Sequence, residues 1–280
     1  MLKFFLYKFG EFLALILPWR AAYRVGMFFS DLQYFLSEKD RDAVINNLRV
    51  ILPNDDEKSI QRKTKEVFEN FGLYLVEFFR SSKIDADYIK KYVNFEGIDY
   101  LKNVVKESGA ILLTAHIGNW ELGGMILSSL GFHSIAIALN HSYGKVNDFF
   151  IKRRKEKGIE VIHLGLSIRK CFQGLKEKKL IAILGDRDFS NSGYEMDFLG
   201  KTKMIPRGPA VLAKKANVPI IPAFAVRRNF NYITIKVFPP IYIAQNDDER
   251  QIMSKFVKII EQQIYEHPTQ WLMFREFWKE

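Results

Sequence analysis

His116 and Glu121 stand five positions apart in a glycine-marked segment, and together their side chains could perform general-base chemistry. The apolar run 110–113 is short, which is typical of a buried strand, so His116 follows the end of a predicted strand. Gly118 permits a tight backbone turn, and Asn119 is a good N-cap for the helix that follows. The sequence therefore predicts a strand–turn–helix junction at this pair.

On a continuous helix, five positions correspond to about 500°, so the two side chains can meet only across a turn. There Glu121 could hydrogen-bond one imidazole nitrogen and leave the other as a general base. The alternative is that Glu121 only complements the helix dipole and that His116 is a polar residue at a strand end. A metal site is less well supported, because the sequence has no HExxH motif and its other histidines are scattered, at His133, His141, His163 and His267.

The composition limits the class of protein and its partners. The chain has 280 residues, 48% of them hydrophobic, which excludes disorder and allows one large domain or a core with a helical extension. The lone Cys171 excludes a disulfide framework. The formal net charge of +10 favours an anionic partner such as anionic lipid or an acidic carrier protein. No nucleic-acid partner is expected, because no RNA-binding signature or zinc-finger spacing occurs.

The N-terminal segment is rich in phenylalanine and leucine but is interrupted by Lys3, Lys8 and Glu11 and stops at Pro18. It is too short and too interrupted for a membrane span, and no small-residue cleavage site follows it. Aromatic and basic residues beside an apolar helix suit a helix that lies in a membrane interface. We therefore predict such a helix over residues 1–30; the alternative is a core helix that packs on the body of the domain.

The rest of the chain divides into a helical part and an alternating part. Residues 31–92 are predicted to be helical, with a break near Pro53. From residue 93 onward, apolar or β-branched runs alternate with helical stretches; the strands are predicted at 95–97, 111–115, 134–139, 161–162, 180–184, 220–226 and 233–238, and the helices at 98–106, 122–130, 146–157, 168–176 and 209–216. This alternation predicts an α/β core over residues 93–280, with a mostly parallel central sheet flanked by helices. No repeat or linker indicates a second independent domain.

Three polar clusters follow predicted strands and are expected to converge at one edge of the sheet. They are the His116 turn, the Asn140–His141 region and the acidic loop of Asp186, Arg187 and Asp188. In the loop, one carboxylate could assist the dyad or bind an acceptor hydroxyl, and Arg187 could hold an anion. The alternative is an internal Asp–Arg ion pair that closes the loop.

Basic residues mark two further segments. Arg207 precedes the predicted helix 209–216, and cations near a helix N-terminus suit phosphate binding. The alternative is a solvated basic loop. The basic residues between 152 and 157 are interpreted first as the solvated face of a helix.

Taken together, these residues resemble the bacterial lipid A biosynthesis acyltransferases, the lauroyl- and myristoyl-transferase group of the lysophospholipid acyltransferase superfamily. The hallmark of that group is a histidine followed by four residues and then Asp or Glu, which here is His116 to Glu121. The similarity covers nearly the whole chain, and other matching segments are Asn46-Asn47-Leu48, Phe68–Gly72, Asp186-Arg187-Asp188, Phe198-Leu199-Gly200, Val218–Pro222 and His267–Trp271.

The resemblance implies acyl transfer from an acyl carrier protein, or less often coenzyme A, to a hydroxyl of a glycolipid such as a lipid A precursor. It places the enzyme at the cytoplasmic face of the bacterial inner membrane. It assigns the general base to His116 and the orienting carboxylate to Glu121, with no covalent acyl-enzyme. An arginine before a glycine is functional in relatives, and Arg154 matches it best, with Arg153 as the neighbour. We expect no cofactor or metal, and we predict that substrate is bound by Asn119, Arg154, Asp186, Arg187, Asp188 and Arg207.

Two departures from the family pattern bear on the identity of the acceptor. The segment 273–279 is not the usual tryptophan-rich ending, and Arg187 stands where relatives often have Gln or His. An alternative of a different class is a non-catalytic peripheral membrane protein that binds a lipid and presents it. A third is a lipase-like hydrolase, in which water replaces the acceptor hydroxyl.

Overall fold

A central sheet of seven strands organises the chain, and the computed structural model describes residues 2–138, 144–163, 168–189 and 192–279. The strand order is β1-β9-β8-β2-β5-β3-β4, and every neighbouring pair is parallel except β8 and β9. The strands are β1 (Val93–Glu96), β2 (Ala110–Thr114), β3 (Ser134–Ala138), β4 (Ile159–His163), β5 (Leu180–Leu184), β8 (Ile220–Asn229) and β9 (Tyr232–Val237). The predicted α/β class with a mostly parallel sheet is confirmed.

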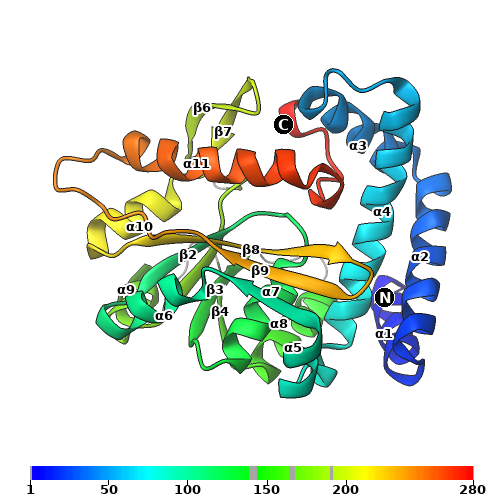
Figure 1. Cartoon of the computed structure of the whole chain (residues 1–280), viewed down its shortest axis with the longest axis horizontal. Helices are drawn as coiled ribbons and strands as arrows, with labels where there is room; N and C mark the ends of the chain where they lie inside the picture. The colour runs from blue at the N-terminus through cyan, green and yellow to red at the C-terminus, as the bar shows by residue number, and fades with distance from the viewer. Residues whose placement is uncertain (1, 139–143, 164–167, 190–191, 280) are drawn as a thin grey trace.

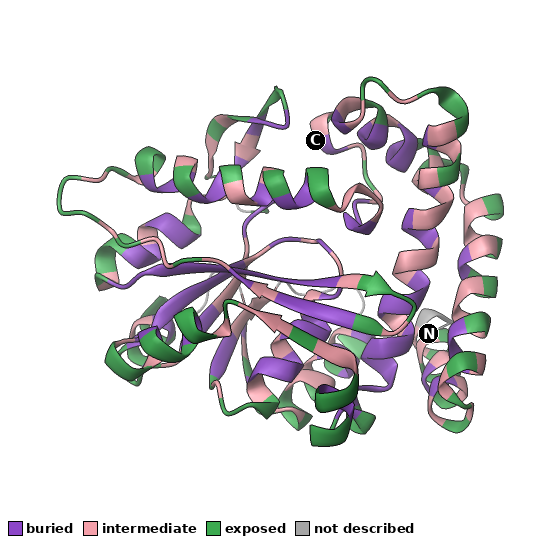
Figure 2. Cartoon of the chain, in the orientation of Figure 1, coloured by how far each residue is buried: buried purple, intermediate pink, exposed green. Residues whose placement is uncertain are grey.

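Helices cover both faces of this sheet (Figure 1). One face packs against α9 (Ile168–Lys176), α10 (Gly208–Ala216) and α11 (Glu249–Glu266); the other packs against α5 (Ala86–Tyr92), α6 (Ile98–Glu107) and α7 (Trp120–Ser129). Strand β2 supplies both cores, because successive side chains of a strand point to opposite faces. Ile111 and Leu113 join the first core, and Ala110 and Leu112 join the second. The strands are therefore mostly buried, as Figure 2 shows.

The N-terminal helices form a wall beside the sheet: α1 (Leu2–Ile16), α2 (Trp19–Leu36), α3 (Glu38–Ile51) and α4 (Glu57–Phe79). The predicted break near Pro53 is confirmed, and Asp56 caps α4 by accepting from Ser59 N at 2.7 Å. Helices α2 and α4 approach closely at two glycines: a Cβ on Gly72 would lie 2.7 Å from the carbonyl oxygen of Gly26. Helix α8 (Gly144–Glu156) packs on the same wall, through Phe149 and Phe150.

The N-terminal segment is two helices rather than one, because the chain turns at Pro18, which cannot donate a helical hydrogen bond. Within the described residues, no helix carries an apolar stretch long enough to cross a membrane.

A β-hairpin and one long helix were not predicted. The hairpin of β6 (Tyr194–Phe198) and β7 (Lys201–Ile205) has charged residues in both strands, so no apolar run marks it. Helix α11 did carry a local signal, since Asp248 and Gln251 form a capping box at its start.

Candidate active site

The register of two neighbouring strands brings His116 and Asp186 together. Strands β2 and β5 are parallel neighbours, and Thr114, the last residue of one, is paired with Leu184, the last residue of the other. The backbone continues the pairing, with Gly185 N donating to Thr114 O at 2.8 Å. His116 and Asp186 each follow two residues after a strand end, so they meet at the carboxyl edge of the sheet.

Asp186 holds the imidazole of His116. Its Oδ1 lies 2.9 Å from His116 Nδ1, while its Oδ2 accepts from His116 N at 3.1 Å and from Trp271 Nε1 at 3.2 Å. Burial alone would raise the pKa of this carboxyl, but the imidazole and these hydrogen bonds outweigh burial and hold the pKa below its ordinary value. An ionised carboxylate on Nδ1 keeps a proton there and leaves Nε2 as the nitrogen that can accept one. The His116 side chain is 21% exposed, so it remains within reach of a ligand.

The predicted strand–turn–helix junction is confirmed. Gly118 adopts a φ of 63°, and a Cβ at this position would lie 2.0 Å from Ala225 O, so the turn requires glycine. Asn119 is the N-cap of α7, as predicted, because its side chain accepts from Leu122 N at 3.0 Å. Asn119 is also buried, at 1% exposure, which places it behind the site rather than on its surface.

Glu121 does not contact the imidazole, contrary to the expected geometry. It faces α8 and forms a bidentate ion pair with Arg154, with Nε to Oε2 at 2.9 Å and Nη2 to Oε1 at 2.5 Å. Burial lowers the pKa of Arg154, but the charge of Glu121 and its hydrogen bonds outweigh burial and raise it. The interpretation of residues 152–157 as a solvated face is therefore wrong for Arg154, and also for Arg153, which pairs with the buried Glu11.

Aromatic rings connect this ion pair to the histidine. The ring of Trp120 lies edge-on to His116 at 5.0 Å, and Tyr74 packs on Trp120 at 4.7 Å. Burial, followed by the charge of Glu121, raises the pKa of Tyr74 well above its ordinary value. The aromatic side of the site is therefore uncharged, with Trp120 against the imidazole and Tyr74 behind Trp120.

The other predicted residues lie in different surroundings. Arg187 stacks on Phe189 at 4.4 Å, and Asp188 accepts from Gly193 N at 2.8 Å, so both shape the loop after β5. Arg207 lies 3.7 Å from Glu249 at the start of α11, and no contact joins it to His116 among the described residues. The Asn140–His141 region lies outside the described residues. In the described part of the chain, no cluster of three or more His, Cys, Asp or Glu side chains could hold a metal ion.

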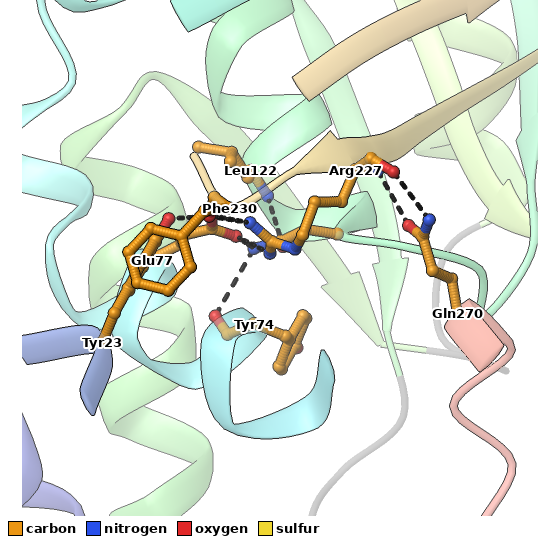
Figure 3. A network of polar contacts seen from close by, with 8 residues as sticks. Tyr23, Tyr74, Glu77, Leu122, Arg227, Phe230 and Gln270 are labelled. Carbon is orange, nitrogen blue, oxygen red and sulfur yellow. Dashed lines mark hydrogen bonds and ion pairs between the residues drawn. The ribbon is translucent and has the colours of Figure 1, made fainter. Parts of the chain in front are cut away.

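A buried polar network behind the turn was not predicted (Figure 3). The Glu77 carboxylate accepts from both terminal nitrogens of Arg227, at 2.7 and 2.8 Å, from Asn119 Nδ2 at 2.7 Å and from the hydroxyl of Tyr23. Gln270 completes it through paired 2.8 Å hydrogen bonds with the backbone of Arg227. These donors satisfy a carboxylate that is 1% exposed. The five residues are far apart in the sequence, so no local pattern could reveal them.

Tyr23→Phe should lower the free energy of unfolding by about 1 to 3 kcal/mol, because it removes one hydrogen bond to the buried charge of Glu77. Tyr88→Phe is the matched control, since Tyr88 is also buried but its hydroxyl has no hydrogen-bond partner in the described part of the chain. Urea unfolding of the two variants measures the difference. Equal stabilities would show that the Tyr23 hydroxyl contributes nothing.

Several known proteins are similar to this chain in sequence. The sequence profile described as bacterial lipid A biosynthesis acyltransferase matches residues 1–280. The phosphatidylinositol mannoside acyltransferase of Mycobacterium tuberculosis is 26% identical over 217 residues, which cover 75% of this chain and 68% of that protein. The lipid A biosynthesis palmitoleoyltransferase of Escherichia coli is 22% identical over 86% of this chain and 79% of that protein, and the lipid A biosynthesis acyltransferase of Haemophilus influenzae is 24% identical over 91% and 83%.

Proposed function

Because this chain belongs to the bacterial lipid A biosynthesis acyltransferase family, and is therefore an O-acyltransferase, we propose that it moves a fatty acyl chain from a thioester to a hydroxyl of a glycolipid. The observation that carries this proposal is the 2.9 Å contact between His116 Nδ1 and the buried Asp186. A histidine that is oriented in this way can act as a general base on a hydroxyl.

The transfer proceeds without a covalent enzyme intermediate. Nε2 of His116 takes the proton of the acceptor hydroxyl as its oxygen attacks the thioester carbonyl carbon. The tetrahedral intermediate then collapses, the carbon–sulfur bond breaks, and the imidazolium returns the proton to the leaving thiolate. Asp186 stabilises the imidazolium while it exists and keeps the ring in place.

The remaining polar residues have supporting roles in this proposal. Glu121 holds Arg154, so that a buried guanidinium and its partner brace α7 against α8 beside the imidazole. Asn119 supports the same turn as its N-cap. Arg187 and Asp188 directly follow Asp186, which suits them to contact the acceptor headgroup.

The chemical classes of the donor and the acceptor are proposed from the charge of the chain. The formal net charge of +10 suits an acidic donor, either an acyl carrier protein or coenzyme A, and an anionic glycolipid. Arg207 is assigned to the anion of one of these substrates, because it lies at the start of α10. The names of the relatives include both lipid A enzymes and a phosphatidylinositol mannoside acyltransferase, so a lipid A precursor is one acceptor within a wider glycolipid class.

The first two helices are proposed to rest on the anionic surface of the bacterial inner membrane, on its cytoplasmic face. Helix α1 turns its buried Glu11 inward to Arg153. Together α1 and α2 expose large apolar side chains: Phe5, Leu6, Phe9, Phe12, Ile16, Phe28, Phe29, Leu32, Phe35 and Leu36. A pair of helices that exposes so many large apolar side chains suits a lipid interface. In this proposal the membrane-binding part extends over both helices, and the core begins with β1.

Phe12→Ser and Leu36→Ser should each weaken binding to phosphatidylglycerol-containing vesicles by about tenfold, since a large apolar side chain contributes about 1.5 to 3 kcal/mol when it leaves water. These residues are 56% and 74% exposed. Leu130→Ser is the matched control, because Leu130 is exposed after α7 rather than on α1 or α2. Vesicle cosedimentation measures the binding. Equal affinity for all three variants would exclude this surface.

The activity itself is tested with purified protein, an acyl carrier protein thioester, acyl-coenzyme A and a lipid A precursor or mannosylated phosphatidylinositol. Mass spectrometry of the lipids distinguishes acyl gain from release of free fatty acid. We expect acyl gain. Free fatty acid alone would indicate a hydrolase, and no reaction with any pair would contradict the proposal.

A further inference from the structure

The segment around Trp271 forms one wall of the site, next to Asp186. It runs alongside the turn that carries His116. Leu272 N donates to His116 O at 2.8 Å, Gly118 N donates to Gln270 O at 2.8 Å, and Ile117 and Trp271 form an isolated antiparallel bridge. The backbone on both sides of the catalytic turn is therefore held by residues 270–272.

The side chain of Trp271 contacts Asp186 directly. Its indole N–H donates to Asp186 Oδ2 at 3.2 Å, and both residues are buried. Asp186 Oδ1 faces His116 Nδ1, while Oδ2 accepts from both the indole and the backbone N–H of His116. A donor on Oδ2 limits rotation of the carboxylate and so fixes where Oδ1 lies.

Two asparagines of the N-terminal helices hold this segment on either side of Trp271. Asn70 on α4 donates to Thr269 O at 3.0 Å. Asn47 on α3 donates to Met273 O at 3.0 Å and to Arg275 O at 2.7 Å, and its own oxygen accepts from Phe277 N at 3.0 Å. Asn47 is 3% exposed. The backbone on both sides of Trp271 is thus held by groups outside the α/β core.

We propose that Trp271 is a positioning residue: it acts through Asp186 to keep His116 in the orientation that accepts a proton, and Asn47 and Asn70 keep it in place. This inference rests on the proposed base role of His116. It predicts that the indole N–H, more than the bulk of the ring, determines the rate of transfer.

Trp271→Phe should lower kcat by about tenfold, as expected for losing a hydrogen bond to a charged group, with KM changed by less than about twofold. Trp278→Phe is the matched control. Trp278 packs beside Trp271, with ring centroids 6.1 Å apart, but its indole nitrogen has no partner in the described part of the chain. Thermal midpoints of both variants report any general loss of packing.

The sulfur analogue of tryptophan, benzothienylalanine, lacks the N–H and keeps the shape of the ring. It can be incorporated at position 271 if the Trp271→Phe variant does not fold. We expect the analogue at position 271 to reproduce the tenfold loss and the analogue at position 278 to be fully active. Full kcat with the analogue at position 271, or equal losses at both positions, would overturn the inference.

A second readout does not need turnover. The proton on His116 Nδ1 should give a downfield nuclear magnetic resonance signal that is absent in His116→Ala, and the analogue at position 271 should shift it while the analogue at 278 should not. An unshifted signal would overturn the role of Trp271, whichever lipid is the acceptor. If instead His116→Ala retains its activity, the proposed base fails, and the positioning role fails with it.

Discussion

His116→Ala should lower the rate of acyl transfer by about 10² to 10⁴, the usual cost of removing a general base. The imidazole of His116 lies at the carboxyl edge of the sheet, and its Nε2 can accept a proton because Asp186 occupies the other nitrogen. The loss should appear in kcat, since the base acts in the transition state and contributes little to ground-state binding. Steady-state assays with thioester donor and glycolipid measure it.

His133→Ala is the control for that experiment, because His133 is exposed in the turn before β3. It should leave the rate unchanged. Circular dichroism and the thermal midpoint must show that His116→Ala is folded, and a folded variant with near wild-type turnover would remove His116 from the mechanism.

Asp186→Asn should lower kcat by about 10³ to 10⁴ although it preserves the shape of the side chain. An amide cannot hold the imidazole proton on Nδ1 as a carboxylate does, and it cannot stabilise the imidazolium that forms during the reaction.

The Asp186→Asn substitution should also change how the stability of the protein responds to acid. The pKa of Asp186 is lowered in the folded protein, so its stabilising effect is present above the unfolded pKa and is lost as the pH falls through the folded pKa. Asp186→Asn lacks this contribution, which acid unfolding measures.

Glu121→Gln tests which of two carboxylates, Glu121 or Asp186, orients the base. It leaves Asp186 on the imidazole but removes the charge that pairs with the buried Arg154. We expect it to lower thermal stability more, and kcat less, than Asp186→Asn does, because an unpaired buried charge is costly. The reverse order, with Glu121→Gln folded and inactive while Asp186→Asn still turns over, would return the orienting role to Glu121.

The local part of the site could be predicted from the sequence. An apolar run, Gly118 and the N-cap Asn119 are enough to define the junction that presents His116, because each depends on neighbouring residues. The sequence also predicted that the acidic loop would converge on this edge of the sheet, but not that Asp186 would take the place of Glu121 on the imidazole of His116. Asp186 lies beside it only because β5 inserts next to β2, and strand order depends on contacts distant in sequence.

The same reason explains the other differences. Arg154 belongs to a strongly basic stretch that is typical of a solvated helix, and its ion pair with Glu121 of α7 exists only in the assembled fold. Glu77, Arg227 and Gln270 come from three separate elements, so their network follows from the assembled fold. The hairpin β6–β7 lacks an apolar run, whereas α11 had a capping box that was overlooked.

The register between β2 and β5 has an evolutionary consequence. The distance between His116 and Asp186 is set by backbone hydrogen bonds across two adjacent strands, not by the length of the chain that connects them. That connection includes α7, β3, α8, β4 and α9. Insertions and deletions in its loops can therefore reshape the surface around the site while His116 and Asp186 stay in place. One scaffold can in this way acquire new acceptors without rebuilding its chemistry.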